Sequence, residues 1–408
     1  MNILFVSISE LPQMDKHSIS LDLLHEFKKN GHTIYAVCAN ERRNNSDTFC
    51  SEEDGYHVLR VKTGNNKKAN LIEKGVTTIR LPFMYIFAIK RYYSGVKFDL
   101  VLYPTPPVTH ARTVEFIKKR DGAVAYLLLK DIFPQNAVDI GMLSKKGLKA
   151  VVYKYFRHKE KKLYALSDYI GCMSNANVEY ILKHNLELNA AKVELFPNAV
   201  EPIDMSVADK EILSIREKYA IPQDRVVFMY GGNLGKPQGI PFLIDCLKKQ
   251  RDNEKTFFLI IGDGTEYGKI DAFIKEYDPP NVKLLKKLPK EEYDCLVAGC
   301  DVGMIFLDHR FTIPNFPSRL LSYMQAKIPV LAATDGNTDV GKVIVEGEFG
   351  WWCESNDSGS FIERVDEACS ADRTIMGQKA WNYMIENYTA EKGYHIIMKH
   401  LENENMSV

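Results

Sequence analysis

The residues best suited to chemistry in this chain form a run that can bind a phosphate group. Pro317 and Ser318 precede an amphipathic helical pattern whose first turn carries Arg319, and an apolar run, residues 330–332, follows. The first N–H groups of a helix lack partners and carry partial positive charge, so they attract anions, and a guanidinium adds donors of fixed geometry. The pattern indicates an anion site, and an ordinary serine-capped helix leading into a sheet is the alternative.

Two glycine turns upstream predict a second part of the same site. Gly231-Gly232-Asn233-Leu234-Gly235 follows a predicted strand at 226–230, and Gly262-Asp263-Gly264 follows another at 257–261. Glycine lets a backbone approach a ligand closely, although the Gly262-Asp263-Gly264 turn by itself is more typical of simple chain reversal. The spacing differs from the Gly-x-Gly-x-x-Gly dinucleotide fingerprint. Taken together, the strand-end features predict a diphosphate bound in a cleft.

Length and composition indicate a folded chain with more than one domain. The 408 residues are 45% hydrophobic and 26% charged, and two domains are the natural expectation. The net charge of zero hides an asymmetry: residues 1–205 hold 29 Lys and Arg against 22 Asp and Glu, a net +7, and the remainder holds 24 against 31, a net −7. A basic amino half suits an anionic membrane surface.

Several classes of protein are disfavoured by what the sequence lacks. The eight cysteines include no Cys-x-x-Cys pair, which favours reduced thiols over disulfides or a zinc cluster. A basic signal-peptide start and an apolar run of about 18 residues are both missing, so a cytoplasmic protein without a spanning helix is expected. No Asp-x-Asp pair occurs, and the diphosphate is therefore predicted to bind without a metal ion.

Short apolar runs alternate with helical patterns, which is typical of parallel sheets with crossover helices. In the first half the predicted strands are residues 3–7, 33–38, 100–103, 123–129, 169–172 and 193–196. In the second half they are residues 226–230, 257–261, 283–285, 302–305, 330–332 and 349–353. Residues 44–70 are interpreted as a loop or a small hairpin. We expect domains at 1–200 and 201–380, with a C-terminal helix at 381–408 that packs back on the first domain.

The ordered motifs resemble a known enzyme family. Residues 231–239 (GGNLGKPQG), 261–264 (IGDG), 287–293 (KLPKEEY) and 317–324 (PSRLLSYM) are similar to retaining GT-B glycosyltransferases of the family 4 type. Residues 104–107 (PTPP) and 131–135 (DIFPQ) resemble elements of the branch that makes bacterial O-antigens and capsules, including fucosamine-type aminosugar transferases. The resemblance spans almost the whole chain.

The resemblance implies a fold, a reaction and a cellular location. It implies an α/β GT-B fold, in which two Rossmann-like, doubly wound parallel-sheet domains face each other across a cleft. It further implies transfer of a sugar (EC 2.4) from a nucleotide-sugar donor, with UDP favoured, to a lipid-diphosphate-linked saccharide with retention and without a cofactor. The enzyme would lie on the inner face of the cell membrane and would not bind nucleic acid. A non-catalytic GT-B scaffold and a GT-B sugar-nucleotide epimerase are the alternatives.

Site residues follow from the same resemblance. Arg319 and Asp131 are the candidate catalytic residues, and Glu10 and His110 are placed on the acceptor side. The expected donor-binding residues are Gly232, Asn233, Gly235, Lys236, Gly262, Asp263, Gly264, Leu288, Pro317, Ser318, Arg319, Leu320 and Ser322, with no metal ligand among them. For Leu288 core packing is the alternative, and for Asp131 a turn or capping role.

The sequence departs from the family pattern at four positions. Many members carry a pair of glutamates, the second of which holds the donor ribose, and the matching positions here are Pro314 and Ser322. The Arg and Lys that often hold the diphosphate correspond to Asn233 and Gln238. Phosphate binding is therefore expected to depend more on Arg319.

Two stretches suggest contact with a membrane. Residues 81–93 mix apolar and aromatic side chains with a basic end, and residues 147–164 interleave lysines and an arginine with tyrosines and a phenylalanine. Helices of this kind lie well on anionic bilayers, and ordinary packing with a solvated basic face is the alternative.

Overall fold

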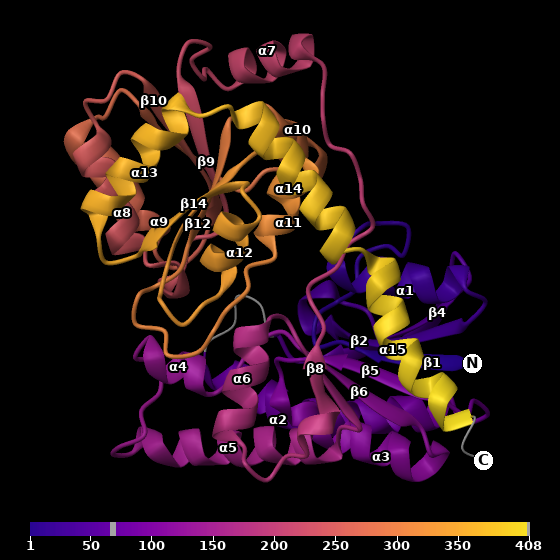
Figure 1. Cartoon of the computed structure of the whole chain (residues 1–408). Helices are drawn as coiled ribbons and strands as arrows, with labels where there is room; N and C mark the ends of the chain where they lie inside the picture. Colours follow the sequence, from indigo (N-terminus) through magenta and orange to yellow (C-terminus); the bar gives the residue numbers. More distant parts are fainter. Residues whose placement is uncertain (66–70, 406–408) are drawn as a thin grey trace. The chain divides into compact units, whose positions relative to one another are not determined.

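The computed structural model describes residues 1–65 and 71–405 and divides the chain into two compact units (Figure 1). The first unit comprises Met1–Glu201 and Ala390–Val408, and the second comprises Pro202–Thr389. Each unit is built on its own sheet, and neighbouring strands are parallel with a single exception among the described pairs. The predicted α/β class with two Rossmann-like sheets is therefore confirmed.

An eight-stranded sheet forms the centre of the first unit, in the order β3-β4-β2-β1-β5-β6-β7-β8. Its strands are β1 (Asn2–Val6), β2 (Thr33–Glu41), β3 (Phe49–Glu53), β4 (Tyr56–Thr63), β5 (Leu100–Pro104), β6 (Val124–Leu129), β7 (Tyr169–Cys172) and β8 (Val193–Leu195). The antiparallel pair β3–β4 is the small hairpin expected within residues 44–70, and β4 joins the main sheet beside β2. Residues 66–70 lie outside the part that the structure describes.

Helices cover both faces of this sheet. Helices α1 (Ile19–Lys29) and α15 (Ala390–Asn405) cover one face, where the Phe27 and Tyr394 rings pack edge to face with centroids 4.9 Å apart. Helices α2 (Leu71–Tyr92), α3 (Ala111–Asp121) and α5 (Lys149–Leu166) lie together on the other face, as Figure 1 shows. The remaining helices of the unit are α4 (Gln135–Asp139) and α6 (Asn175–His184).

The second unit has a six-stranded parallel sheet in the order β11-β10-β9-β12-β13-β14. Its strands are β9 (Val226–Asn233), β10 (Thr256–Asp263), β11 (Val282–Leu285), β12 (Val302–Phe306), β13 (Val330–Thr334) and β14 (Gly350–Glu354). Helices α8 (Ile240–Gln250), α9 (Tyr267–Tyr277) and α13 (Ser358–Ser370) pack on one face with a shared apolar core (Figure 1). The others are α7 (Asp209–Lys218), α10 (Lys290–Ala298), α11 (Arg319–Gln325), α12 (Val340–Glu346) and α14 (Arg373–Asn387).

The register of β9 and β10 brings the two glycine turns together. Gly232 pairs with Gly262, and Asn233 pairs with Asp263, at the carboxyl ends of the strands. A Cβ atom on Gly262 would lie 1.8 Å from the carbonyl oxygen of Gly232, so no side chain fits there. The two turns therefore form a single rim, exposed at Gly232, Asn233 and Asp263, at the edge where parallel sheets bind ligands.

No helix in the described part of the chain combines the length and apolar character needed to cross a bilayer.

Candidate active site

A cavity of ≈ 740 Å³ in the second unit opens at this rim. It is lined by Gly232, Asn233, Ile261, Gly262, Asp263, Lys287, Leu288, Pro289, Lys290 and Tyr293. Five of these residues belong to the predicted donor-binding set, and they come from the ends of β9 and β10 and from the segment before α10. The structure thus brings together residues that lie up to about sixty positions apart in the sequence, because parallel strands end at one edge of the sheet.

The Arg319 guanidinium lies directly behind the rim. Its central carbon is 4.3 Å from the centroid of the Tyr230 ring, and its Nη2 would be 3.1 Å from a Cβ atom on Gly232. Gly232 has φ +134°, a conformation that other residues rarely adopt, so the site needs glycine for both backbone shape and space. Nη1 is buried, and no described residue accepts a hydrogen bond from it. An anion that supplied this acceptor would satisfy a buried donor that is otherwise unpaired.

Three tyrosines lie near the guanidinium, and each is fixed by its own contacts. The Tyr230 hydroxyl donates to the carbonyl oxygen of Asn233 at 2.8 Å, and the Tyr323 hydroxyl donates to the carbonyl of Met304 at 3.0 Å. Tyr293 occupies the space next to Gly231, where a Cβ atom would lie 2.0 Å from the phenolic oxygen. Burial raises the pKa of Tyr293 to about 12, so its hydroxyl stays neutral.

Arg319 remains charged although it is largely surrounded by protein. Burial alone would lower the pKa of Arg319, but the neighbouring tyrosines, Tyr230 foremost, raise it above its ordinary value. The positive charge is therefore retained without a carboxylate partner. The sequence analysis did not include Tyr230 among the site residues, because a tyrosine within a predicted strand is ordinarily expected to pack in the hydrophobic core.

The helix behind Arg319 differs from the sequence-based expectation. Helix α11 has only seven residues, and Ser318 has helical backbone angles and no capping hydrogen bond from its side chain. The Leu320 side chain is buried, and its N–H donates to the Pro317 carbonyl at 3.2 Å. Pro317 and Ser322 are half-buried, whereas Ser318 is exposed. Because these backbone donors are partly used and the helix is short, the arginine side chain is the main cationic group here.

Gln238 braces the glycine turn rather than facing a ligand. Its Oε1 accepts from Asn233 Nδ2 at 3.0 Å and from the Gly235 N–H at 3.2 Å. Lys236 is exposed at the start of the 3₁₀ turn Lys236–Gln238. The two positions at which the family often carries cations therefore bond to each other in this chain.

At the other turn, Asp263 is exposed and accepts from the Gly264 N–H at 2.9 Å. A Cβ atom on Gly264 would lie 2.4 Å from the carbonyl oxygen of Leu234, which explains the second glycine of this turn.

Lys287, on the cavity wall beside Leu288, is exposed and has no carboxylate partner among the described residues. It is a second candidate cation, and it was not among the donor-binding residues expected from the sequence.

Asp131 lies just beyond β6 in the first unit, in a setting that favours its neutral form. Burial raises the pKa of its carboxyl to about 6, and Asn136 Nδ2, which donates to both oxygens at 2.7 and 2.8 Å, opposes the rise. The residue makes no cap for α4, whose N-cap is Pro134. A carboxyl that titrates near pH 6 can accept a proton or a strong hydrogen bond under physiological conditions.

Lys130, beside Asp131, is a candidate that the sequence did not reveal. Burial lowers the pKa of its ammonium to about 7, and its Nζ is buried without a hydrogen-bond partner among the described residues. Nζ lies 5.2 Å from the centroid of the Phe196 ring. Only the tertiary structure indicates this environment, because a lysine after a strand is ordinarily solvated.

The predicted acceptor-side residues are not brought together. The His110 side chain is fully buried, and burial lowers the pKa of its imidazole to about 3, so the ring is neutral. It stacks near Tyr85 with ring centroids 5.9 Å apart. Glu10 is exposed and accepts from Asn44 Nδ2 at 3.2 Å. His110 therefore has the character of a core residue in this structure.

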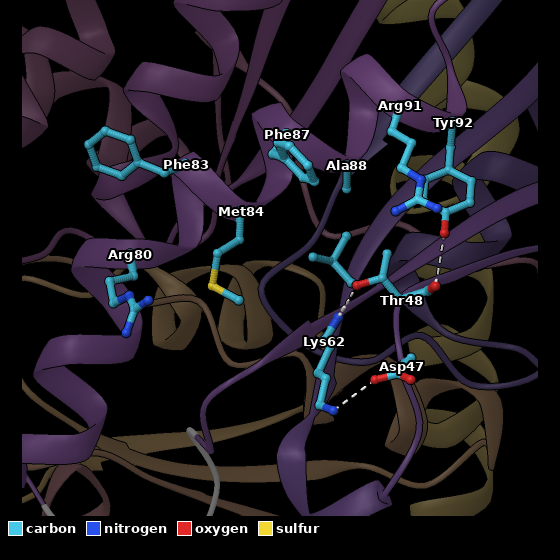
Figure 2. Close-up of a pocket in the computed structure, with 11 residues that line it drawn as sticks. Asp47, Thr48, Lys62, Arg80, Phe83, Met84, Phe87, Ala88, Arg91 and Tyr92 are labelled. Atoms are coloured by element: carbon cyan, nitrogen blue, oxygen red, sulfur yellow. Dashed lines mark hydrogen bonds and ion pairs between the residues drawn. The ribbon is translucent and has the colours of Figure 1, made fainter.

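A second cavity, of ≈ 830 Å³, lies in the first unit along α2 (Figure 2). Phe83, Met84 and Phe87 line it on the helix side, with Arg80 and Arg91 toward opposite ends of this stretch of helix. Across from them, Lys62 pairs with Asp47 at 2.8 Å. This cavity lies within one of the two stretches that the sequence related to membranes.

Comparisons with known proteins agree with this architecture. Residues 211–389 match the family model of the group 1 glycosyl transferases. The chain is 25% identical over 334 residues to "Probable glycosyltransferase WbjE" of Pseudomonas aeruginosa, with 80% of each protein covered. It is 21% identical over 276 residues to "Putative colanic acid biosynthesis glycosyl transferase WcaI" of Escherichia coli K12, covering 65% of this chain and 66% of that protein.

A solved structure extends the likeness to the whole chain. Alr3699/HepE from Anabaena, in complex with UDP-glucose, matches with a TM-score of 0.70 and 15% identity, covering 99% of this chain and 100% of that chain. At this identity the likeness shows the fold. The fold match covers both units, so the chain has the GT-B fold, and most of its second unit is similar to the group 1 glycosyl transferases.

Proposed function

We propose that the protein transfers a sugar from a UDP-sugar to a lipid-diphosphate-linked saccharide, with retention of configuration, in the assembly of a bacterial surface polysaccharide. The names of the relatives WbjE and WcaI, which both describe glycosyl transferases, support sugar transfer as the reaction. The name of WcaI, which refers to colanic acid biosynthesis, supports a polysaccharide as the product. The UDP-glucose bound to the Anabaena protein supports the nucleotide.

The observation that carries the proposal is the unpaired Arg319 guanidinium behind the Gly232 turn. Its buried Nη1 has no acceptor within the described protein, and Gly232 leaves room for a ligand oxygen to approach. A diphosphate offers several charged acceptors, and an arginine can bind two of them in parallel. The apolar wall at Leu288 and Pro289 suits a nucleobase, whose faces are apolar and whose edges hydrogen-bond to backbone.

In the proposed reaction the main contribution of the protein is to stabilise the departing diphosphate. In front-face transfer the bond from the anomeric carbon to the donor phosphate breaks, and a departing phosphate oxygen takes the proton of the acceptor hydroxyl. Negative charge grows on the diphosphate as the bond breaks, so a fixed guanidinium stabilises the transition state more than the ground state. Arg319 has this role in our proposal, and Lys287 assists it.

Asp131 is proposed to act on the acceptor. Its carboxylate, once ionised, would orient the attacking hydroxyl by a charged hydrogen bond, which selects the reactive geometry. Because burial raises the pKa of the Asp131 carboxyl, this group can also take up a proton. In its neutral form it no longer holds the hydroxyl by a charged hydrogen bond.

The absent glutamates favour one alternative, a GT-B protein that binds no sugar nucleotide. Pro314 is buried and Ser322 is half-buried, so neither supplies a carboxylate for a ribose. Absence of nucleoside-diphosphate binding would support that scaffold, whereas conversion of a UDP-sugar without an acceptor would support the epimerase.

Attachment to an anionic membrane at its cytoplasmic face is proposed to occur through α2 and α5. Val76, Ile79, Phe83 and Phe87 are exposed at spacings that place them on one face of α2, and Leu148 and Val151 are exposed at the start of α5. Arg80 and Arg91 flank the α2 stripe and pair with no carboxylate in the described part of the chain. Apolar residues flanked by cations favour a bilayer interface.

The basic residues of α5 contribute less than the sequence suggested. Arg157 bonds to Glu160, Lys161 pairs with Glu187 at 2.8 Å, and Lys162 pairs with Glu115 at 2.7 Å. Lysines engaged in ion pairs offer less charge to a membrane, and the free cations of α2 become the better test.

Arg319→Ala should weaken UDP binding by about ten- to a hundredfold, since a charge-assisted phosphate contact contributes about 1.5–3 kcal/mol. Calorimetric titration of UDP measures the change, with Arg251→Ala, an exposed arginine in the same unit, as the matched control. Equal UDP affinity in Arg319→Ala and in the control would remove Arg319 from the donor site.

UDP should bind more tightly than GDP. The affinity for UDP should be the same in EDTA as in excess Mg²⁺ or Mn²⁺, because the chain lacks an Asp-x-Asp pair to hold a bridging ion. Thermal-shift and calorimetric measurements on the intact protein test both statements. UDP binding that appears only with a divalent ion would refute the metal-free donor site.

The transfer rate should rise with pH through about 6, because the Asp131 carboxyl is neutral below that pH and ionised above it. Asp131→Asn should abolish this limb and slow transfer by about tenfold or more, since a charged hydrogen bond becomes neutral. UDP affinity should not change in this variant. A limb that persists near pH 7 would instead point to Lys130.

Arg80→Gln with Arg91→Gln should weaken binding to phosphatidylglycerol vesicles by about ten- to thirtyfold at low salt, since each basic residue near such a surface contributes up to about 1 kcal/mol. Lys29→Gln with Lys399→Gln removes the same charge from α1 and α15 on the other face of the sheet and serves as the control. Equal loss in both pairs would mean that binding depends only on net charge. Lack of binding by the wild type would end the membrane proposal.

A further inference from the structure

Two histidines and a glutamate converge in the first unit at a place to which no function has been assigned. One ring nitrogen of His17, one of His25 and one carboxylate oxygen of Glu201 all lie within 4.8 Å of one another. His17 directly precedes the Ser18 N-cap of α1, His25 lies on that helix, and Glu201 is the last residue of the unit. The side chains of His17 and His25 are 39% and 21% exposed, so the group is open to solvent on one side.

Each imidazole has a partner that determines which nitrogen keeps its proton. His25 Nε2 lies 2.7 Å from the Met14 carbonyl oxygen, which can only accept, so this nitrogen carries the hydrogen and Nδ1 keeps its lone pair. His17 Nδ1 lies 3.0 Å from Asp22 Oδ1, and the same argument leaves Nε2 with a free lone pair. A carboxylate or carbonyl behind a histidine is the usual second layer of a metal site, because it orients the ring and makes the other nitrogen a better ligand.

Asp22 is well placed to hold this arrangement. Its side chain is 2% exposed, and its Oδ2 accepts from the Glu201 N–H at 3.0 Å, while Oδ1 also accepts from the Ser18 N–H at 3.2 Å. The same carboxylate therefore orients His17 and positions the backbone of Glu201. The convergence depends on a buried, fully bonded residue and not only on flexible surface side chains.

The separations within the cluster can be compared with those around a tetrahedral ion. Ligands that bind zinc at about 2.0–2.1 Å in a tetrahedron lie about 3.3 Å from one another. In this structure the three candidate ligand atoms, one from each of His17, His25 and Glu201, lie within 4.8 Å of one another. The Glu201 side chain is exposed, so rotation about its side-chain torsions can bring its carboxylate closer to the two rings. Two neutral imidazoles with two carboxylates also leave a net charge of −2, which a divalent cation neutralises.

We propose that the first unit binds a zinc ion through His17, His25 and Glu201, with Asp22 as the residue that positions His17. Two nitrogen ligands favour zinc over magnesium or calcium, which prefer oxygen ligands throughout. The ion would fasten the chain at Glu201 to the start of α1. The predicted absence of a metal concerned the donor diphosphate, and the two proposals involve residues of different units.

The test uses tag-free, metal-stripped full-length protein titrated with Zn²⁺ by calorimetry, with thermal unfolding as a second measurement. We expect one Zn²⁺ per chain, a higher melting temperature with Zn²⁺, and no response to Mg²⁺. His25→Ala should lower zinc affinity by at least about a hundredfold, since even losing a residue behind a ligand costs about ten- to a hundredfold. Substitution with Co²⁺ should give the strong visible absorption of a four-coordinate ion.

Matched variants separate a metal site from ordinary histidine chemistry. Glu201→Gln keeps the size of an exposed side chain and should fold normally, yet it should weaken zinc binding and the thermal shift. His158→Ala removes an exposed histidine on α5 and should leave both unchanged. UDP affinity, which depends on the second unit, reports whether each variant remains folded. If the wild type does not bind Zn²⁺, or if Glu201→Gln and His25→Ala bind it like the wild type, the cluster is only a set of ion pairs and the proposal is wrong.

Discussion

The second unit is organised around an arginine that has no carboxylate partner. A buried guanidinium normally requires an ion pair, because burying a charge is costly. Here the guanidinium lies over the ring of Tyr230, and Arg319 keeps its charge while Nη1 has no acceptor among the described residues. Such an arrangement leaves a cation ready for an anionic ligand.

The position of this arginine depends on the sheet. Gly232 and Gly262 are paired across β9 and β10, and the close contact between them leaves no room for a side chain. The same contact exposes a rim of backbone in front of the guanidinium, and Gln238 keeps the loop in shape from the far side. A substitution at either glycine would therefore disturb both the register and the cavity.

The first unit shows a different use of burial. Asp131 and Lys130 follow β6, and burial moves the pKa of both toward neutrality, from opposite directions. His110, by contrast, is buried so completely that its ring stays neutral and has no route to a ligand. Position near a strand end is thus insufficient for a role in chemistry, since the extent of burial decides whether a group can meet a substrate.

The sequence by itself determined the class of fold, most of the strands, and segments that meet at the cavity beside the ends of β9 and β10. Alternating apolar runs and helical patterns are local signals in the sequence. Glycine turns that follow strands are local signals too, and they indicate which residues lie at the edge of the sheet. The likeness of residues 211–389 to the group 1 glycosyl transferases was also indicated by motifs that lie in order along the chain. Even the hairpin of β3 and β4 was among the two expectations for a polar stretch.

Only the tertiary structure decided which of the candidate groups are free, charged or accessible. The roles of Tyr230 and Gln238, the burial of His110, and the ion pairs that engage Lys161 and Lys162 all depend on residues distant in sequence. The convergence of Glu201 with His17 and His25 spans nearly the whole first unit and has no local pattern. These features depend on residues that are distant in the sequence and come together only in the folded chain. A sequence pattern gives the type of each residue but not its neighbours in space.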